Sequence, residues 1–184
     1  HHPGSRHIPP TLACRPSTTG SPMHVIGAPG PSRTTAVSAP ATATAGAPFN
    51  FTGAAKDSSG NVVTGYNVTL HFTSTDGAAT LPADAMLVNG VGTFPATLKT
   101  AGTQTITATD TVTPALTGTS NPILVVAGST VHFVVAAPST TTAGNPFNFT
   151  VTAKDANDNT VINYAGTVHF TSSDLTAILP ADYT

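Results

Sequence analysis

The stretch from Ala45 to Asp84 constrains the fold of this chain more than any other feature, because it occurs twice. Shifted by 98 residues, it aligns without a gap on Ala143 to Asp182, and 24 of the 40 aligned residues are identical. A period of this length exceeds the roughly 20–50 residues of a solenoid unit and matches the size of a small domain. The sequence therefore predicts a domain that is repeated in tandem.

The composition favours strands over helices. Charged residues make up 8% of the 184 residues, and all eight acidic residues are Asp. Exposed helix positions are usually filled by Glu, Lys, Gln and Arg. This chain is instead rich in Thr, Ser, Asn and Gly, which favour strands and turns. We therefore expect an all-β protein.

The chain divides into three predicted regions. Residues 1–33 are rich in Pro, Ser, Gly and Thr without regular alternation, so we expect a disordered or non-native N-terminal segment. Residues 34–128 hold the first domain, and residues 129–184 begin the second. At the same offset, the second copy has no counterpart of Met86 to Ala127. We expect only the N-terminal half of a domain there, with an open inner face that is unstable or pairs abnormally.

Alternating apolar residues predict the strands of the first repeat. The apolar residues Phe49, Phe51 and Ala55 are separated by two and four positions, so they share one face of a strand, and this alternation is typical of a half-buried strand. Further strands are expected at Val37, Val68–Thr73, around Phe94, at Thr103–Thr109 and at Ile123–Val126. About seven short strands separated by turn residues are typical of an antiparallel β-sandwich. The expected core consists of Phe49, Phe51, Leu70, Phe72, Phe94, Leu98 and Ile106.

An ordered series of short motifs runs through the first repeat. It passes from Asp57-x-x-Gly60-Asn61 and Val68-x-Leu70-x-Phe72 to Ala101-Gly102-Thr103-x-Thr105. The series resembles bacterial immunoglobulin-like repeats of the invasin and intimin type, over residues 34–128 and, as half a module, over residues 130–184. The resemblance implies an immunoglobulin-like sandwich with a spacer, stalk or adhesion role, no cofactor and neighbouring repeats as partners.

Three polar residues match the start of a calcium-binding loop. They are Asp155, Asn157 and Asn159, but Thr160 holds the sixth position, where Gly is required, and Gly166 holds the twelfth, where Glu is required. The alternative is an Asx-rich turn, whose side chains bond to their own backbone. We expect the turn and keep the three residues as calcium candidates.

Catalysis and transition-metal binding lack the residues that they require. His71 and His169 alternate with apolar residues and should face outward, and neither repeat offers the three or four converging ligands that zinc needs. Asp76 and Asp84 could form a carboxylate pair, but they are expected on turns away from any cleft. The sequence therefore predicts a protein that is not an enzyme and holds no metal of this kind.

Two features could serve ligand binding. Tyr66 and Tyr164 are the repeated aromatic residues on which a sugar could stack, although we expect them to plug the sandwich edge. Thr alternates from Thr103 to Thr113, which is typical of an exposed strand. A flat face for ice or sugar needs several such strands in register, and the sequence shows one.

Charge and hydropathy narrow the partners. Residues 34–184 contain three Lys and all eight Asp, so there is no basic stripe for nucleic acid. No apolar run approaches the roughly 18 residues of a membrane span. We expect a non-catalytic spacer module of a secreted or cell-surface bacterial protein that could contribute to adhesion. The alternatives are a module that binds a surface glycan or a host protein, and an accessory domain of a secreted hydrolase.

Overall fold

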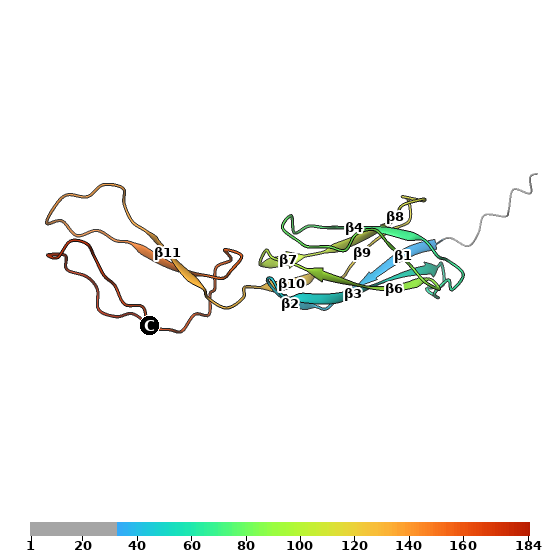
Figure 1. Ribbon diagram of the computed structural model, residues 1–184, viewed down its shortest axis with the longest axis horizontal. Coiled ribbons are helices and arrows are strands. Elements are labelled where there is room, and N and C mark those ends of the chain that lie inside the picture. Colours follow the sequence, from blue (N-terminus) through green and yellow to red (C-terminus); the bar gives the residue numbers. More distant parts are fainter. Residues whose placement is uncertain (1–32) are drawn as a thin grey trace, which may run out of the picture. The chain divides into compact units, whose positions relative to one another are not determined.

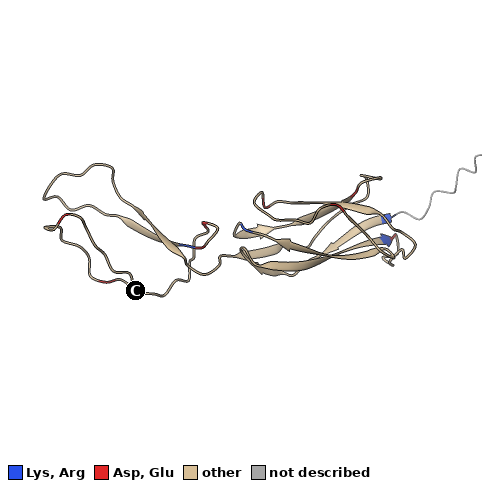
Figure 2. Cartoon of the chain, viewed as in Figure 1, with Lys and Arg blue, Asp and Glu red and all other residues tan. Residues whose placement is uncertain are grey.

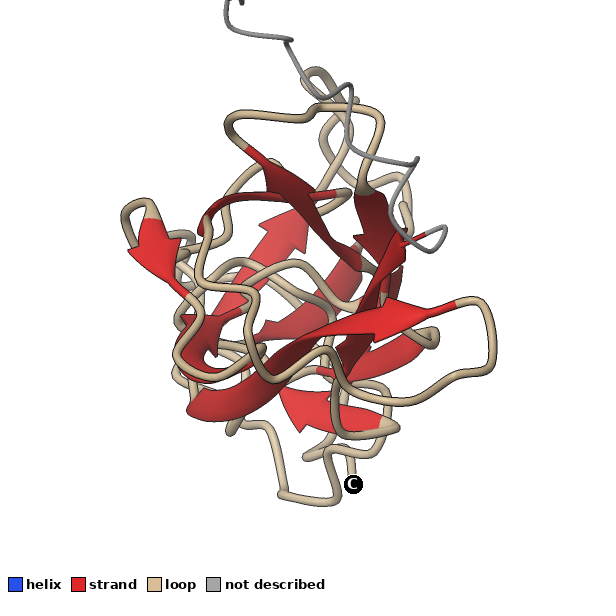
Figure 3. Ribbon diagram, turned by 90° about the vertical axis from the view of Figure 1, so that its right-hand side faces the viewer, coloured by secondary structure: helices blue, strands red, loops and turns tan. Residues whose placement is uncertain are grey.

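The computed structural model describes residues 33–184, which form strands and turns without a helix (Figures 1 and 3). The prediction of an all-β protein is confirmed. The strands are β1 (Arg33–Ser38), β2 (Thr42–Thr44), β3 (Pro48–Asp57), β4 (Thr69–Ser74), β5 (Ala85–Met86), β6 (Val91–Thr97), β7 (Gly102–Gln104), β8 (Ile106–Asp110), β9 (Thr117–Thr119), β10 (Ile123–Val126), β11 (His132–Ala136) and β12 (Thr150–Lys154).

Strands β1 to β10 form an immunoglobulin-like β-sandwich. One sheet has the order β1-β3-β6, the facing sheet has the order β5-β4-β8-β9, and a short third sheet has the order β2-β10-β7. Phe51, Phe72 and Phe94 come from β3, β4 and β6 and pack with ring centroids 4.7–5.6 Å apart. Among the described residues, all fourteen buried hydrophobic side chains lie between Val37 and Val125. This part of the chain therefore has a closed core of its own.

The predicted core is confirmed, except that Phe49 is only partly buried, and the structure adds Leu87 to it. The expected single strand Thr103–Thr109 is wrong, because the chain passes between sheets at Thr105. β7 pairs with β10, whereas β8 pairs with β4. Gln104 turns inward and accepts a hydrogen bond from the Thr75 hydroxyl at 2.7 Å, which gives its buried amide a partner.

The second repeat reproduces the local geometry of the first. β11 pairs with β12 in the register of β1 and β3, so that His132 opposes Lys154 as Thr34 opposes Lys56. Phe149 and Phe170 pack edge to face at 5.4 Å, as Phe51 and Phe72 do at 5.3 Å. The repeat is therefore structural as well as sequential.

The second repeat lacks the strands that cover the first. The counterpart of β4, residues 167–172, is not a strand, and none of the apolar side chains on its open side is buried: Phe149, Val151 and Phe170 are half-buried, and Phe147 and Tyr183 are exposed. A cavity of about 310 Å³ lies on this side, lined by Phe147, Asn148, Phe149, Val151, Phe170, Pro180 and Tyr183. The domain boundaries and the number of modules stay predictions. So does the interpretation of residues 1–33, which lie outside the described residues except for Arg33 in β1.

Charges are sparse and lie at the ends of strands and in the loops between them (Figure 2). Asp57 and Asp110 are the last residues of β3 and β8, and the other acidic residues lie in loops and turns. Three of them, Asp76, Asp110 and Asp155, are buried. A buried carboxylate is costly unless it is hydrogen-bonded, so these three positions indicate where the fold depends on polar contacts.

Candidate functional site

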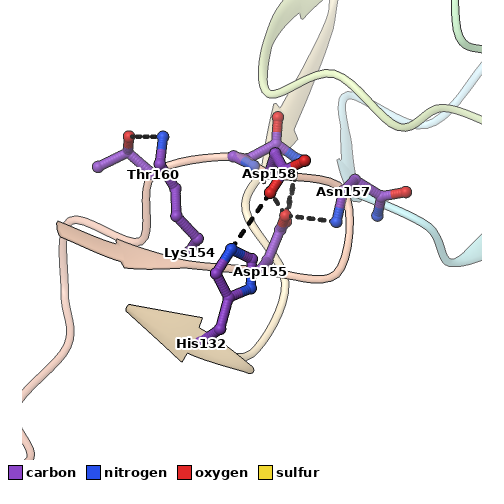
Figure 4. A network of polar contacts seen from close by, with 7 residues as sticks. His132, Lys154, Asp155, Asn157, Asp158 and Thr160 are labelled. Atoms are coloured by element: carbon purple, nitrogen blue, oxygen red, sulfur yellow. Dashed lines mark hydrogen bonds and ion pairs between the residues drawn. The ribbon is translucent and has the colours of Figure 1, made fainter. Parts of the chain in front are cut away.

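The turn after β12 is built around Asp155 (Figure 4). Its Oδ1 accepts hydrogen bonds from the amides of Asn157 and Asn159 at 2.8 and 2.9 Å, which is the pattern of an Asx turn. Asp158, within the turn, adopts a positive φ of 63°. A ring nitrogen of His132, on β11, lies 3.2 Å from the Asp158 carboxylate. The sequence favours this turn because Asp and Asn tolerate the left-handed region.

Asp155 is 1% exposed, and its second oxygen is also occupied. Oδ2 accepts the amide of Gly128 at 2.8 Å and the side-chain amide of Asn159 at 2.9 Å. Burial by itself would raise the pKa of Asp155, but the Asn159 side chain and three backbone amides, led by that of Gly128, lower it from 3.8 to about 2. Asp155 is therefore an anion that fixes both its own turn and the linker after β10.

Asn159 connects this turn to the sandwich. Its Nδ2 donates to the carbonyl of Lys99 at 2.7 Å, and its Oδ1 accepts from the amide of Ala101 at 2.8 Å. The donor and acceptor of one side chain thus satisfy two backbone groups of the loop between β6 and β7. This pairing is specific because Asn presents both functions in one plane.

The loop that receives Asn159 is held by another buried carboxylate. Asp76 accepts hydrogen bonds from the amides of Lys99 and Thr100 at 2.6 and 3.0 Å, and from the Thr100 hydroxyl at 2.7 Å. Burial by itself would raise the pKa of Asp76, but these bonds lower it below its usual value. We call the connected set Asp76, Lys99–Ala101, Gly128, Asp155 and Asn159 the junction clamp.

Gly46 permits a close approach beside the junction clamp. It has a positive φ of 81°, and a Cβ at this position would lie 2.8 Å from Nδ2 of Asn157. Gly46 therefore satisfies both the turn conformation and the space that Asn157 occupies. Residues from both repeats contribute to this contact.

The first repeat carries the same turn without these outside contacts. Asp57 accepts the amides of Ser59 and Asn61 at 2.9 Å each, and the Asn61 side chain reaches Asp57 at 3.4 Å. Within residues 33–184, neither side chain has a hydrogen-bond partner outside the turn 57–61. Asn61 is exposed, whereas Asn159 is partly buried.

The calcium candidates Asp155, Asn157 and Asn159 are brought together by the structure, but N–H donors surround the carboxylate. Both oxygens of Asp155 face these donors rather than an open site. Among residues 33–184 no group of three or more His, Cys, Asp or Glu side chains could hold a metal ion. Chemically, the arrangement is suited to holding backbone segments together.

The two predicted outward histidines each pair with an aspartate. His71 lies 2.7 Å from Asp84, and His169 lies 2.6 Å from Asp182, with all four side chains exposed. Sequence reasoning missed these pairs, although the signal was present, because both partners recur at the same spacing in the two repeats. Exposed pairs of this kind contribute about 0–1 kcal/mol.

The two tyrosine candidates have different environments. Tyr66 donates to Asp110, and the guanidinium of Arg33 lies 4.7 Å from its ring centroid. Tyr66 therefore lies at the sandwich edge in a structural role. Tyr164 is 40% exposed and packs edge to face against Phe133 at 5.2 Å.

The threonine face extends further than the sequence indicated. Thr73, Thr107 and Thr119 lie in register on β4, β8 and β9. Thr107 and Thr119 share a hydrogen bond of 3.0 Å, and Thr109 and Thr117 share one of 3.1 Å. The expectation of one such strand is therefore wrong, because β9 pairs Thr117 and Thr119 with the threonines of β8, and β4 adds Thr73, although His71 of β4 lies opposite Thr109.

The carboxylates considered for catalysis do not converge. Asp76 binds the loop after β6, and Asp84 pairs with His71. Each carboxylate is engaged in a separate local structure. Among the residues that the structure describes, no helix is long and apolar enough to cross the hydrocarbon layer of a membrane.

Three solved structures resemble this fold. The Escherichia coli adhesin FdeC aligns with 25% identity and a TM-score of 0.48, over 71% of this chain and 43% of the adhesin chain. Domains 4–9 of the surface layer protein SbsC align with 23% identity and a TM-score of 0.39, over 70% and 21%. The CARDB domain of the PF1109 protein from Pyrococcus furiosus aligns with 19% identity and a TM-score of 0.37, over 52% and 89%.

No family model and no curated protein matches the chain. The chain spans less than half the length of the adhesin and surface layer structures.

Proposed function

We propose that this chain is a non-catalytic spacer segment of a secreted or cell-surface bacterial protein, in which consecutive immunoglobulin-like modules are held together by the junction clamp. The observation that carries the proposal is the pairing of Asn159 with Lys99 and Ala101. A spacer must transmit position from one module to the next. A flexible linker alone would not fix the position of one module on the next. Side-chain hydrogen bonds across the junction do fix it.

The invasin- and intimin-type relationship belongs to the same proposal. It is supported by the sandwich of β1 to β10 and by the repetition of its β1–β3 register in β11 and β12. A contribution to adhesion would come from domains that such a spacer carries. Its partners under this proposal are neighbouring immunoglobulin-like modules.

Distances between two spin labels test whether the junction is fixed. Exposed Val112 and Ile162 would be changed to Cys in a Cys14→Ser background and labelled. We expect a narrow distance distribution, which Asn159→Ala broadens because the bonds to Lys99 and Ala101 are lost. Asn61→Ala is the matched control, since it removes the equivalent side chain of the first repeat. Equal widths in all three proteins would contradict a clamped spacer.

A second candidate function is binding of a surface glycan or host protein through the threonine face. The in-register hydroxyls of Thr73, Thr107 and Thr119 favour it. A glycan array would compare the wild-type chain with a Thr107→Val/Thr119→Val variant. Loss of a specific signal in the variant would support this alternative, whereas no binding by either protein supports the spacer. Tyr66→Ala is unsuitable as a probe because Tyr66 binds buried Asp110.

A further inference from the structure

The first repeat contains a second copy of the docking turn of the junction clamp. In both turns the aspartate Oδ1 accepts two backbone amides at 2.8–2.9 Å. The aspartate amide donates back to the carbonyl of the fifth residue, at 2.9 Å for Asp57 and 3.0 Å for Asp155. Gly60 takes the positive φ that Asp158 takes in the second copy. The turn is therefore formed in the first repeat with nothing docked against it within residues 33–184.

The two turns differ in how their side chains are used. Asn159 donates to one backbone carbonyl and accepts one backbone amide outside its turn. Asn61, in contrast, bonds only to Asp57, at 3.4 Å, and its Oδ1 accepts no hydrogen bond from residues 33–184. Oδ2 of Asp57 likewise has no counterpart of the Gly128 amide among these residues. The second copy thus uses three groups outside its turn: Nδ2 and Oδ1 of the asparagine and Oδ2 of the aspartate. In the first copy the same three groups have no partner outside the turn among residues 33–184.

We propose that the turn Asp57–Asn61 is a docking site for the C-terminal end of another immunoglobulin-like module. The inference rests on the proposed spacer function and identifies a further partner for the same kind of contact. Asn61 would bind the loop of that module that corresponds to Lys99–Ala101, and Asp57 would accept the amide that corresponds to Gly128. The site lies at the end of β3, on an exposed turn.

The chemistry of the contact defines the partner. It must present a backbone carbonyl and a backbone amide two residues apart in an extended loop, followed along the chain by a linker amide. Asp76 shapes such a loop in this chain by binding the amides of Lys99 and Thr100. In another intact copy of the chain this loop is already occupied by Asn159. The partner is therefore a module whose own loop is unoccupied.

A concatenated chain tests the proposal. Residues 33–130 would be placed directly before Arg33, so that Gly128, Ser129 and Thr130 lead into Arg33 as they lead into Val131. The inserted sandwich contains every hydrophobic side chain that is buried among residues 33–184. The measurement is amide hydrogen exchange, by NMR, of Ala101 in the inserted module.

In the concatenated chain, Asn61→Ala is made in the copy that follows the inserted module. We expect this variant to accelerate hydrogen exchange of the inserted Ala101 amide by up to about tenfold, because the acceptor of that amide is lost. The same variant in the 184-residue chain should leave the exchange rate of the Ala101 amide unchanged, since that amide donates to Asn159. Ser59→Ala is the matched control, because Ser59 bonds within the turn through its backbone amide. Unchanged exchange of Ala55, whose amide binds the Gly90 carbonyl, verifies that β3 is intact.

Two results separate the failure of this inference from the failure of the spacer proposal. One result is that Asn61→Ala leaves the exchange rate of the inserted Ala101 amide unchanged, while Asn159→Ala accelerates exchange of the Ala101 amide that Asn159 binds. The docking site at Asp57–Asn61 is then overturned and the junction clamp stands. If neither variant changes the exchange of Ala101, both proposals are overturned. Acceleration by both variants supports both.

Discussion

A carboxylate that is removed from water needs hydrogen-bond donors, and Asp155 obtains all of them from its own turn and the linker. Its amide partners include Asn157, Asn159 and Gly128. Because two of these belong to the turn and one to the linker, a single charge couples the two segments. At the scale of the residue, the junction clamp therefore depends on the ionised form of Asp155.

We expect the clamp to weaken in acid. The pKa of Asp155 is lowered from 3.8 to about 2, so its contribution is present above pH 3.8 and is lost as the pH falls through about 2. The contribution is roughly 2 kcal/mol. Carboxyl and amide chemical shifts followed by NMR should show a midpoint near 2 for Asp155 and for the amide of Gly128. A midpoint at or above 3.8 would contradict this prediction.

Tyr66 is predicted to stabilise the sandwich through Asp110, which is fully buried. Tyr66→Phe removes one donor from this carboxylate and leaves the amides of Val112 and Thr113. We expect a loss of about 1–3 kcal/mol in the free energy of unfolding, measured with urea. Tyr183→Phe, at an exposed position, is the control. Equal effects of the two variants would show that the Tyr66 hydroxyl adds nothing.

At the scale of the element, two nearly identical hexapeptides have different structures. Thr69–Ser74 and its copy at residues 167–172 differ only at Leu70, which is Val168 in the copy. The first is β4, because β8 pairs with it over five residues, and the second forms only a bridge between Val168 and Tyr183. Alternation predicts which side chains share a face, but a strand also needs a neighbour.

The same limit explains what sequence reasoning could and could not find. The inward faces of β3 and β4 followed from alternation, because Phe51 and Leu70 obey a period of two. The switch of sheets at Thr105 did not, since alternation carries no information on the identity of the paired strand. Asp155 and Asn159 were recognisable as turn residues, but their partners are backbone atoms of Lys99 and Ala101, which have no residue-type signature.

Gly118 in β9 provides a test of how the two large sheets meet at their edge. A Cβ at Gly118 would lie 1.7 Å from the carbonyl oxygen of Thr35 in β1. Gly118→Ala must therefore move β1 or β9, and we expect a loss of about 1–3 kcal/mol in the free energy of unfolding. Gly77→Ala is the matched control, because a Cβ there meets no atom within 4 Å.

The expected result for Gly77→Ala is a change within about 0.5 kcal/mol, as for other surface substitutions. Thermal unfolding of both variants would be compared with the wild-type chain under the same conditions. If Gly118→Ala is as stable as Gly77→Ala, then β1 and β9 do not approach each other as closely as the structure shows.

At the scale of the whole molecule, burial is unequal between the repeats. Val37 is 8% exposed, whereas its counterpart Val135 is 61% exposed, although both lie on strands with the same register. Tyr183 is 72% exposed beside the cavity of the second repeat. The second repeat is therefore held by its two-stranded sheet and by the junction clamp rather than by a core.

Amide hydrogen exchange should reveal this inequality. Thr52 in β3 and Thr150 in β12 occupy equivalent positions, opposite Ser38 in β1 and Ala136 in β11, so this pair compares identical residue types in the same register. In the 184-residue chain we expect the β12 amides to exchange at least about 100-fold faster, because local opening there exposes little additional apolar surface. Sedimentation must first show a monomer, since association could cover the open face. Equally slow exchange in the two strands of the monomer would mean that residues 130–184 are stable without the counterpart of Met86 to Ala127.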